Sequence, residues 1–360
     1  MGFEAKIIKD SICNGQRLTT MQVTFPRIIL AEWNTHCMFA RNTSSSRAIP
    51  FTKMVKSIIE EPFIPVHWGV NQSGMQAFTE LAGEKRELAI KKWLTARDHA
   101  IRIATELASE QCTDCQGTGK VRCYHYQFGE IDRPNEEPDS SEVIAYSEEP
   151  GFSCPTCGGD GLGLNVHKQI ANRLLEPWMF TTNCTTGDAS AWSNFFALRC
   201  EKDAEPHMQK IAYMAQKEYF TSTPQVLEPG QWHTPYIRYE EYEEIRDWSD
   251  AQPFDSVLFA KTKANINALV QVSTGRCART SYLTQEGTRD FSEDIKLHDR
   301  LRYHTPLHAS PFEHVCLAVG DWNRFGKYIG WKSYRHMLPR EYVTDFRLNH
   351  PELAHDPVEG

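Results

Sequence analysis

The stretch EWNTHCMFARNTSSSRAIPF, Glu32–Phe51, sets a dense group of hydrogen-bonding side chains directly behind the apolar run VTFPRIILAEW. Its histidine, asparagine, serine run and two arginines have the polar texture of a loop, whereas the preceding run predicts a buried strand or helix. Polar groups that lie against a buried element need hydrogen-bond partners. The other motifs of the chain indicate which partners these are.

Composition and charge restrict the class of protein. The chain has 360 residues, of which 40% are hydrophobic, and this allows one large domain or two smaller ones. A net charge of -8 argues against general nucleic-acid binding, which needs a basic face. No apolar run reaches the roughly 18 residues of a membrane span, and the N-terminus lacks a signal-peptide apolar segment. With scattered cysteines read as reduced thiols, we expect a cytoplasmic protein without a membrane partner.

Two C-x-x-C pairs stand out among the eleven cysteines, and each is followed by Gly-x-Gly. They supply Cys112, Cys115, Cys154 and Cys157. Each pair forms a tight turn that aims two sulfurs at one ion, and four thiolates close a tetrahedral zinc shell with no open position for catalysis. The alternatives are a disulfide or free thiols. The spacing C-x-x-C-x-G-x-G resembles one half of the zinc domain of DnaJ-type chaperones.

The rest of the chain divides around this cysteine region. Apolar residues at helical spacing predict a long helix over residues 73–110, and helical patterns resume after Gly163. Residues 225–255 show little periodicity and predict an irregular connection, and the polar tail from Asn349 is expected to fray. We therefore predict that residues 1–107 and 167–360 form two parts of one core, with residues 108–166 as a zinc-binding insertion.

Five segments resemble the flavin-dependent thymidylate synthase family. The residues from Thr35 to Ala48 follow its signature R-H-R-x-x-S-x-N-E-x-S-x-R-Y at His36, Asn42, Ser45 and Arg47. LHASPFEH, Leu307–His314, resembles the family's G-H-x-[ST]-P-F-E-H and is the most specific match. CARTSY, Cys277–Tyr282, resembles its A-A-R-x-S-[FY]. ANRLLEP places Arg173 on a family arginine, and SNFFALRCEKDAEPH matches at Asn194 and Arg199.

The order of these segments differs from the family, because the two segments that open family members come last here. A circular permutation explains this order simply, and it requires that the original chain ends lie close together on the surface. The resemblance then implies an α+β fold, with an antiparallel sheet flanked by helices and a small four-cysteine zinc insertion. It also implies a homotetramer with active sites shared between subunits.

The resemblance implies a chemistry as well. A one-carbon unit would pass from methylenetetrahydrofolate to C5 of deoxyuridine monophosphate, giving dTMP, with FAD reduced by NADPH. Ser45 and Arg199 would be catalytic, and together with Arg47 and Arg173 they would bind the nucleotide. A guanidinium fork suits a phosphate or a pyrimidine carbonyl. The flavin would be bound by a larger set: His36, Asn42, Asn194, Ser281, His308, Ser310 and Glu313.

Departures from the family keep alternatives open. Thr35 and Cys37 replace the two signature arginines that flank His36, and Asp188-Ala189-Ser190 replaces the family's N-A-R flavin contact. Flavin phosphates would lose donors, so either other residues, such as Arg335 or Lys332, supply them or the cofactor is held differently. A related C5-modifying enzyme, for example one with a hydroxymethyl product, is one alternative. A non-enzymatic zinc protein that binds nucleic acid or partners through its cysteine module is the other.

Overall fold

The computed structural model describes residues 2–74, 77–121, 124–126, 129–130, 143–146, 152–250, 268–282, 289–304 and 307–338. The chain forms two compact units. The first comprises Met1–Ser45, Ser73–Gln76 and Phe180–Gly360, and the second comprises Ser46–Gln72 and Ala77–Met179. No helix in the described ranges has the length and apolar character needed to cross a membrane.

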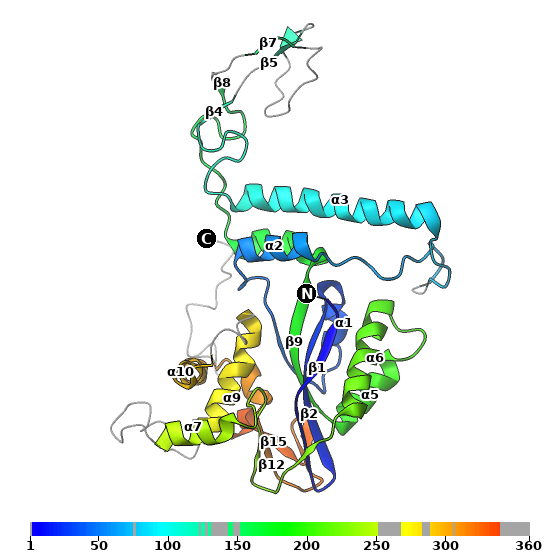
Figure 1. Ribbon diagram of the computed structural model, residues 1–360, viewed down its shortest axis with the longest axis vertical. Helices are drawn as coiled ribbons and strands as arrows, with labels where there is room; N and C mark the ends of the chain where they lie inside the picture. Colours follow the sequence, from blue (N-terminus) through cyan, green and yellow to red (C-terminus); the bar gives the residue numbers. More distant parts are fainter. Residues whose placement is uncertain are drawn as a thin grey trace, which may run out of the picture. The chain divides into compact units, whose positions relative to one another are not determined.

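A five-stranded sheet forms the centre of the first unit (Figure 1). Its strand order is β10 (Gln225–Val226), β1 (Glu4–Cys13), β2 (Gln16–Pro26), β9 (Phe180–Asp188) and β3 (Ala40–Thr43). All neighbours run antiparallel except β1 and β10. Asn14 and Gly15 connect β1 to β2 with φ angles of 47° and 82°, the left-handed pair that a tight hairpin turn requires.

One side of this sheet is covered by α5 (Ala189–Arg199) and α6 (Pro206–Thr221) (Figure 1). Buried aromatic and aliphatic side chains of these helices pack on β2, and Trp192, Phe195, Met21 and Phe25 belong to one core cluster. Asp188 caps α5, and a new helix begins at Pro206, where the ring fixes a helical φ. Residues 189–216 have a helical pattern throughout, but they belong to two separate helices.

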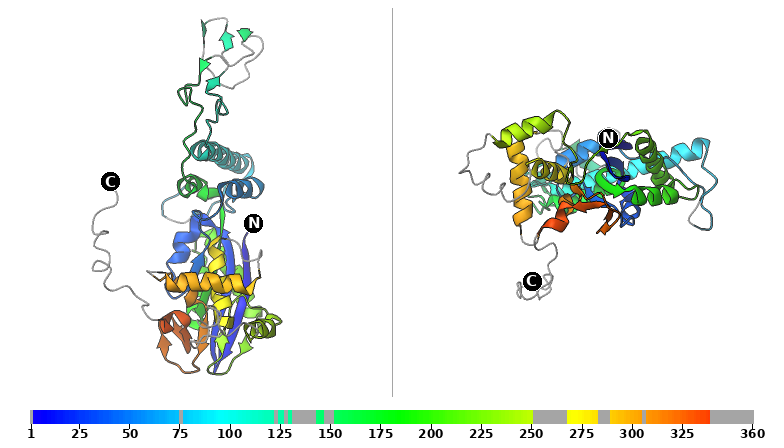
Figure 2. Two further views of the ribbon diagram at one scale, coloured as in Figure 1. Left: turned by 90° about the vertical axis from the view of Figure 1, so that its left-hand side faces the viewer. Right: turned by 90° about the horizontal axis from the view of Figure 1, so that it is seen from below.

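The other elements of the first unit carry its C-terminal motifs. They include α7 (Glu241–Asp250), α9 (Ala268–Arg279) and α10 (Phe291–Tyr303), and α10 packs against α9 (Figure 2). A small sheet has the order β11 (Trp232–His233), β12 (Cys316–Ala318) and β15 (Trp331–Ser333). Short elements complete the unit: η1 (Arg27–Ile29), α1 (Leu30–Asn34), η3 (Thr280–Tyr282), η4 (Ser310–Glu313), β13 (Arg324–Phe325), β14 (Tyr328–Ile329) and η5 (Tyr334–Met337).

A buried ion-pair network joins these helices. The Arg276 guanidinium contacts Asp294 at 2.9 Å and Glu241 at 3.0 Å, and Arg279 contacts Asp294 at 2.7 Å. Because buried charges are tolerated only when they are paired, this network fixes how α7, α9 and α10 pack together. It thereby positions the CARTSY segment, which begins at the end of α9.

The second unit is helical with a small cysteine-rich extension. It contains α2 (Phe51–Glu60), α3 (Gly83–Ala108), α4 (Lys168–Ala171) and η2 (Asn172–Trp178). Trp93, Trp178 and Phe63 form its aromatic core. Beyond α3 lie β4 (Lys120–Val121) and β8 (Phe152–Ser153), which pair, and β5 (Tyr124–Tyr126), β6 (Gly129–Glu130) and β7 (Val143–Tyr146).

These elements confirm a mixed α+β fold with mainly antiparallel sheets, and they correct several local predictions. The helix predicted over residues 73–110 begins at Gly83. The polar stretch is not all loop, because Ala40–Thr43 forms edge strand β3. The irregular connection contains α7, β10 and β11. Residues 251–267 and the tail from Asn349 lie outside the described residues, and the three-part division and the permutation stay predictions.

Candidate functional site

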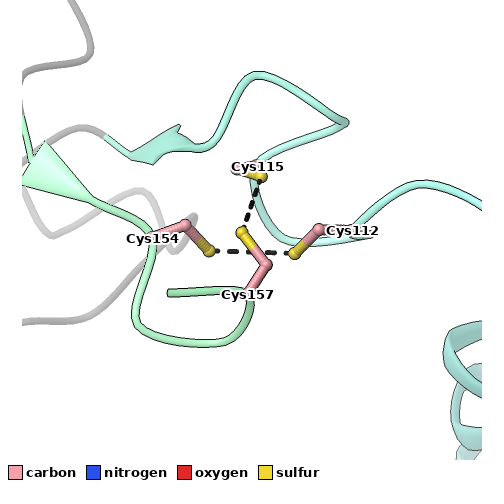
Figure 3. A group of neighbouring side chains, drawn as sticks. All are labelled: Cys112, Cys115, Cys154 and Cys157. Carbon is pink, nitrogen blue, oxygen red and sulfur yellow. Dashed lines mark hydrogen bonds between the residues drawn. The ribbon is translucent and has the colours of Figure 1, made fainter. Parts of the chain in front are cut away.

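Four thiols converge in the second unit (Figure 3). The Sγ atoms of Cys112, Cys115, Cys154 and Cys157 all lie within 4.8 Å of one another. The Cys112–Cys154 and Cys115–Cys157 sulfur pairs are each separated by 3.7 Å. A tetrahedral zinc site with bonds of about 2.3 Å needs sulfurs about 3.8 Å apart. A disulfide bond is only about 2.05 Å long, so the arrangement fits a metal and not two local disulfides.

The backbone around these thiols repeats itself in the two halves of the module. Gly119 N–H donates to the Cys115 sulfur and Gly161 N–H donates to the Cys157 sulfur, each at 3.3 Å. A Cβ on Gly119 would lie 2.2 Å from the Gly159 carbonyl oxygen, and both glycines have positive φ. Only glycine fits such positions. The Gly-x-Gly turns therefore permit both the tight turn and the N–H···S bonds that stabilise a metal-bound thiolate.

In the first unit, Asn42 on β3 joins three segments that are distant in sequence. Its amide nitrogen donates to the Cys277 carbonyl oxygen at 2.7 Å. Its amide oxygen accepts from Ser281 Oγ at 3.2 Å and from Ser310 Oγ at 3.4 Å. The neighbouring Ser45 N–H donates to the Ser281 carbonyl oxygen at 3.1 Å. We call this group of contacts the Asn42 junction.

A second group surrounds His36. The Arg199 Nε–H donates to His36 Nε2 at 2.9 Å, and the same guanidinium reaches Glu32 and Thr35. Burial, followed by the charges of Arg199 and Arg41, lowers the pKa of His36 to about 4. The ring is therefore neutral at pH 7 and can accept the hydrogen bond from arginine. Thr35, which stands where the family has an arginine, is thus itself a partner of Arg199.

The His36 group borders an open space. A cavity of about 270 Å³ is lined by both His36 and Arg199, and Asn194 on α5 lines it too. A larger cavity of about 640 Å³ shares Arg199 with it and is bordered by Glu32 and Glu205. Three of the predicted ligand-binding residues therefore face one cavity. Their ligand roles stay predictions.

Glu313 lies in a cationic setting that the sequence pattern only partly indicated. Its carboxylate contacts Lys327 Nζ at 2.9 Å and Arg335 Nη1 at 2.6 Å. Burial alone would raise the pKa of Glu313, but the charges of Lys327 and Arg335 outweigh it and hold the pKa below its usual value. Arg335 was expected to compensate for lost phosphate donors, whereas Lys327 was not anticipated. In this structure both cations hold the Glu313 carboxylate.

The remaining predicted residues are less enclosed. His308 is exposed, and its ring lies 4.3 Å from that of His304. Arg47 and Arg173 are exposed residues of the second unit, and the residues just before them are linked, because Asn172 Nδ2 donates to the Ser46 carbonyl oxygen at 2.7 Å. Ser45 and Arg199 belong to the first unit. The pocket of three arginines and Ser45 stays a prediction.

No family model matches the chain, and no curated protein matches it. Among solved structures, the UMP/dUMP methylase PolB from Streptomyces cacaoi bound with 5-Br dUMP is similar, with 10% identity and a TM-score of 0.33 over 56% of this chain and 65% of that one. Flavin-dependent thymidylate synthase ThyX from Helicobacter pylori, complexed with FAD and dUMP, has 14% identity and a TM-score of 0.28 over 56% and 67%. Because these values are low, we base the functional proposal on the residues of this chain.

Proposed function

We propose that this protein binds a flavin and a pyrimidine deoxynucleotide monophosphate and transfers a one-carbon unit from methylenetetrahydrofolate to C5 of the base. The observation that supports the proposal is the Asn42 junction. Asn42, Ser281 and Ser310 come from three segments that resemble the flavin-dependent thymidylate synthases, and side-chain hydrogen bonds connect them. If these segments resembled the family only by chance, we would not expect their side chains to share hydrogen bonds with the Asn42 amide.

The flavin, when bound, would supply the redox chemistry of the transfer, with NADPH as the reductant. The residues of this chain would bind and orient. The Asn42 junction offers hydroxyl and amide groups that can exchange an internal partner for a ligand. In the cavity that His36 and Arg199 line, the neutral His36 ring accepts a hydrogen bond from Arg199 and adds no second positive charge. Arg199 would bind the nucleotide through its guanidinium, as Arg47 and Arg173 would from their own segments.

The zinc site would have a structural role. Cys112, Cys115, Cys154 and Cys157 would complete the coordination shell, so no position remains for a substrate or water. The metal would hold the extension of the second unit in its folded form. Assembly as a homotetramer is part of the same proposal.

An absorption spectrum and a flavin titration of the purified protein test the proposal. We expect a flavin spectrum in the protein as isolated or after addition of FAD. Asn42→Ala should weaken FAD binding, because it removes the amide that connects the three segments. Asn183→Ala is the matched control. Asn183 Nδ2 donates to Thr43 Oγ1 at 2.6 Å, and these two side chains lie opposite each other on the other face of the same sheet edge.

The two variants lose similar buried hydrogen bonds, so a general loss of stability would affect both. Folded wild-type protein that takes up no FAD would contradict the proposal. Bound zinc without flavin or nucleotide binding would instead favour a non-enzymatic zinc protein. If flavin and nucleotide both bind, product analysis with deoxyuridine and deoxycytidine monophosphates separates a methyl from a hydroxymethyl product. The replacement of two signature arginines by Thr35 and Cys37 is the observation that favours the second outcome.

A further inference from the structure

Arg41 lies on the edge strand β3, at a position that the family signature leaves undefined. Its Nη1 donates to the carbonyl oxygen of Trp33 at 3.3 Å and to that of Asn34, the last residue of α1. The guanidinium therefore reaches back to the residues that directly precede Thr35 and Cys37, which replace the two signature arginines. A cation from another position of the chain thus lies beside this substituted stretch.

The charge of Arg41 acts on the same stretch. Burial, followed by the charges of Arg199 and Arg41, lowers the pKa of His36. Burial also lowers the pKa of Arg41, and electrostatic interactions with Cys37 and Glu313 oppose this shift. The guanidinium therefore lies within electrostatic range of both His36 and Cys37.

Most of the hydrogen-bond donors of Arg41 are unused. Both of its hydrogen bonds come from Nη1, so the three N–H groups on Nε and Nη2 have no partner among the described residues. No carboxylate in that part of the chain forms an ion pair with Arg41. The side chain is partly exposed, so a ligand can reach it. Because a charge that is partly buried without a partner is costly, a bound anion would stabilise this position.

Glu313 is the carboxylate that interacts electrostatically with Arg41, but other cations already bind it. Lys327 Nζ contacts it at 2.9 Å and Arg335 Nη1 contacts it at 2.6 Å. Lys327 Nζ also donates to the Phe39 carbonyl oxygen at 2.9 Å, which fixes the lysine beside the same stretch. We call Arg41, Lys327, Arg335 and Glu313 the Arg41 group. Its three cations and one carboxylate leave an excess of two positive charges.

The Arg41 group adjoins the cavity of about 270 Å³ described above. The wall of this cavity includes Cys37, which interacts electrostatically with Arg41. It also includes Phe39, whose carbonyl oxygen accepts the hydrogen bond from Lys327. Arg199 lines the same cavity. An anionic ligand in the cavity would therefore be attracted both by Arg199 and by the Arg41 group.

The charge and the shape of this site favour a phosphate group. The Nε and Nη2 atoms of Arg41 form one edge of the planar guanidinium, and two parallel N–H groups on such an edge match two phosphate oxygens. A phosphate monoester carries a charge of about −1.5 to −2 at pH 7, which matches the excess of positive charge in the Arg41 group. Both the flavin dinucleotide and the nucleotide of the proposed function carry phosphate.

We propose that Arg41 binds a phosphate group of the flavin cofactor or of the nucleotide, and that it thereby supplies from β3 a contact that is lost where Cys37 replaces a signature arginine. Lys327 and Arg335 are positioning residues, because they hold the Glu313 carboxylate that would otherwise pair with Arg41. Arg335, which we expected in the phosphate role from the sequence, donates to Glu313 instead. The identity of the ligand rests on the proposed function, whereas the affinity of the Arg41 group for phosphate does not.

Paired titrations with and without phosphate test the proposal. FAD is compared with riboflavin, and deoxyuridine monophosphate with deoxyuridine, by calorimetry. Arg41→Gln retains an N–H donor for the carbonyls at the end of α1 but removes the charge. It should weaken binding of FAD or of the nucleotide by about ten- to a hundredfold and leave the matching phosphate-free ligand unchanged. Arg41→Lys should restore only part of the loss, because a point charge cannot replace two parallel donors.

Arg324→Gln is the matched control. Arg324 is an exposed arginine of β13, and its Nη1 donates to the Lys327 carbonyl oxygen at 2.8 Å. The change removes one positive charge from the hairpin that carries Lys327 but leaves the side chains of the Arg41 group in place. Affinities for all four ligands should stay close to those of wild type. Equal losses in Arg324→Gln and Arg41→Gln would show a general effect of charge and would overturn the proposal.

Inorganic pyrophosphate gives a measurement that needs neither flavin nor nucleotide binding. In ¹⁵N-labelled protein, the Nε–H signal of Arg41 is assigned by its absence from Arg41→Lys. We expect pyrophosphate to shift this signal in a saturable way. The Nε–H signal of Arg324 should move little.

The remaining outcomes separate the phosphate site from the proposed function. A folded Arg41→Gln protein that binds every phosphate ligand as wild type does would overturn the inference. Equal losses of the phosphate ligands and their phosphate-free partners would also overturn it, because they indicate only a structural role of Arg41. If wild type binds neither flavin nor nucleotide, the proposed function fails. A saturable pyrophosphate shift at Arg41 then still supports the phosphate site, and the absence of this shift overturns the site as well.

Discussion

The cysteine module and the Asn42 junction show two different ways to build a site. In the module, four ligands come from two C-x-x-C turns, and the buried cluster around them consists of Cys112, Cys115, Cys154 and Val121. Because so small a cluster cannot offset the conformational entropy lost on folding, we expect a bound metal to stabilise the module. The Asn42 junction instead lies in a unit with a large aromatic and aliphatic core. There, packing positions the polar groups without help from a ligand.

Removing a cysteine ligand should give the largest effect and should be confined to one region. We expect wild type to contain about one zinc ion per chain and Cys112→Ser to lose most of it, because three thiolates leave the shell incomplete. Metal analysis and hydrogen exchange measure this. Backbone amides of the module should lose protection, whereas those of β1 and β2 should not.

Cys37→Ser is the control for this change, because Cys37 is an exposed thiol outside the module. It should leave zinc content and exchange unchanged. Wild-type protein without zinc would contradict the prediction. Loss of protection throughout the sheet of the first unit would show that the fold of this sheet also depends on the cysteine site.

Two glycines of the cysteine module test whether the close approach of its two turns matters for zinc binding. Gly119 and Gly158 both have positive φ, but only at Gly119 would a Cβ collide with backbone, whereas nothing lies within 4 Å of a Cβ at Gly158. Gly158→Ala should cost about 1–2 kcal/mol, the usual penalty of a left-handed residue. Gly119→Ala should cost more and lower zinc affinity by over tenfold, as measured by competition with a chelating dye. Equal losses in both variants would show that the close approach of the two turns is unimportant.

Arginine substitutions test whether Arg199 and Arg173 bind a nucleotide. Arg199→Ala should weaken binding of deoxyuridine or deoxycytidine monophosphate by roughly ten- to a hundredfold in titration calorimetry, since each charge-assisted contact contributes about 1.5–3 kcal/mol. Arg173→Ala should do the same. Arg199→Lys should restore little, because a point charge cannot replace a guanidinium fork.

Arg102→Ala is the control, since Arg102 forms an exposed pair with Glu106 on α3 and is not among the predicted nucleotide-binding residues. It should bind nucleotide as wild type does. If wild type binds a nucleotide and both Arg199→Ala and Arg173→Ala bind it equally well, the predicted pocket lies elsewhere.

The smallest expected effect is a pH dependence of stability from His36. Its folded-state pKa of about 4 lies below its ordinary value of 6.5. Between these values the unfolded chain binds a proton that the folded chain does not, so the free energy of unfolding should fall as pH decreases from 6.5 to 4. Arg199→Gln removes one of the causes, so it should raise the pKa of His36 and reduce this slope. Urea unfolding at several pH values and an NMR titration of His36 measure both; an unchanged pKa in Arg199→Gln would contradict the assigned cause.

Sites whose residues lie close together in the sequence were predicted most completely. The four cysteines were predicted as one site, and their sulfurs do converge. Asn42, Ser281 and Ser310 were predicted to share a ligand, and the structure connects them by hydrogen bonds, while their flavin role stays a prediction. Lys327 was missed, because a lysine in a turn between β13 and β14 carries no motif. Its contact with Glu313 depends on a hairpin that only the folded chain forms.

By itself, the sequence determined the two C-x-x-C turns of the cysteine module and the presence of the long helix that precedes it, because each depends on residues a few positions apart. Tertiary structure decided that Ala40–Thr43 is an edge strand and that α5 and α6 lie on one side of the sheet. It also decided that hydrogen bonds connect His233 to His314 through Thr20 and Thr186. Contacts of this kind join residues more than a hundred positions apart, and strand register brings them together. Register depends on the packing of whole sheet faces, which no local pattern records.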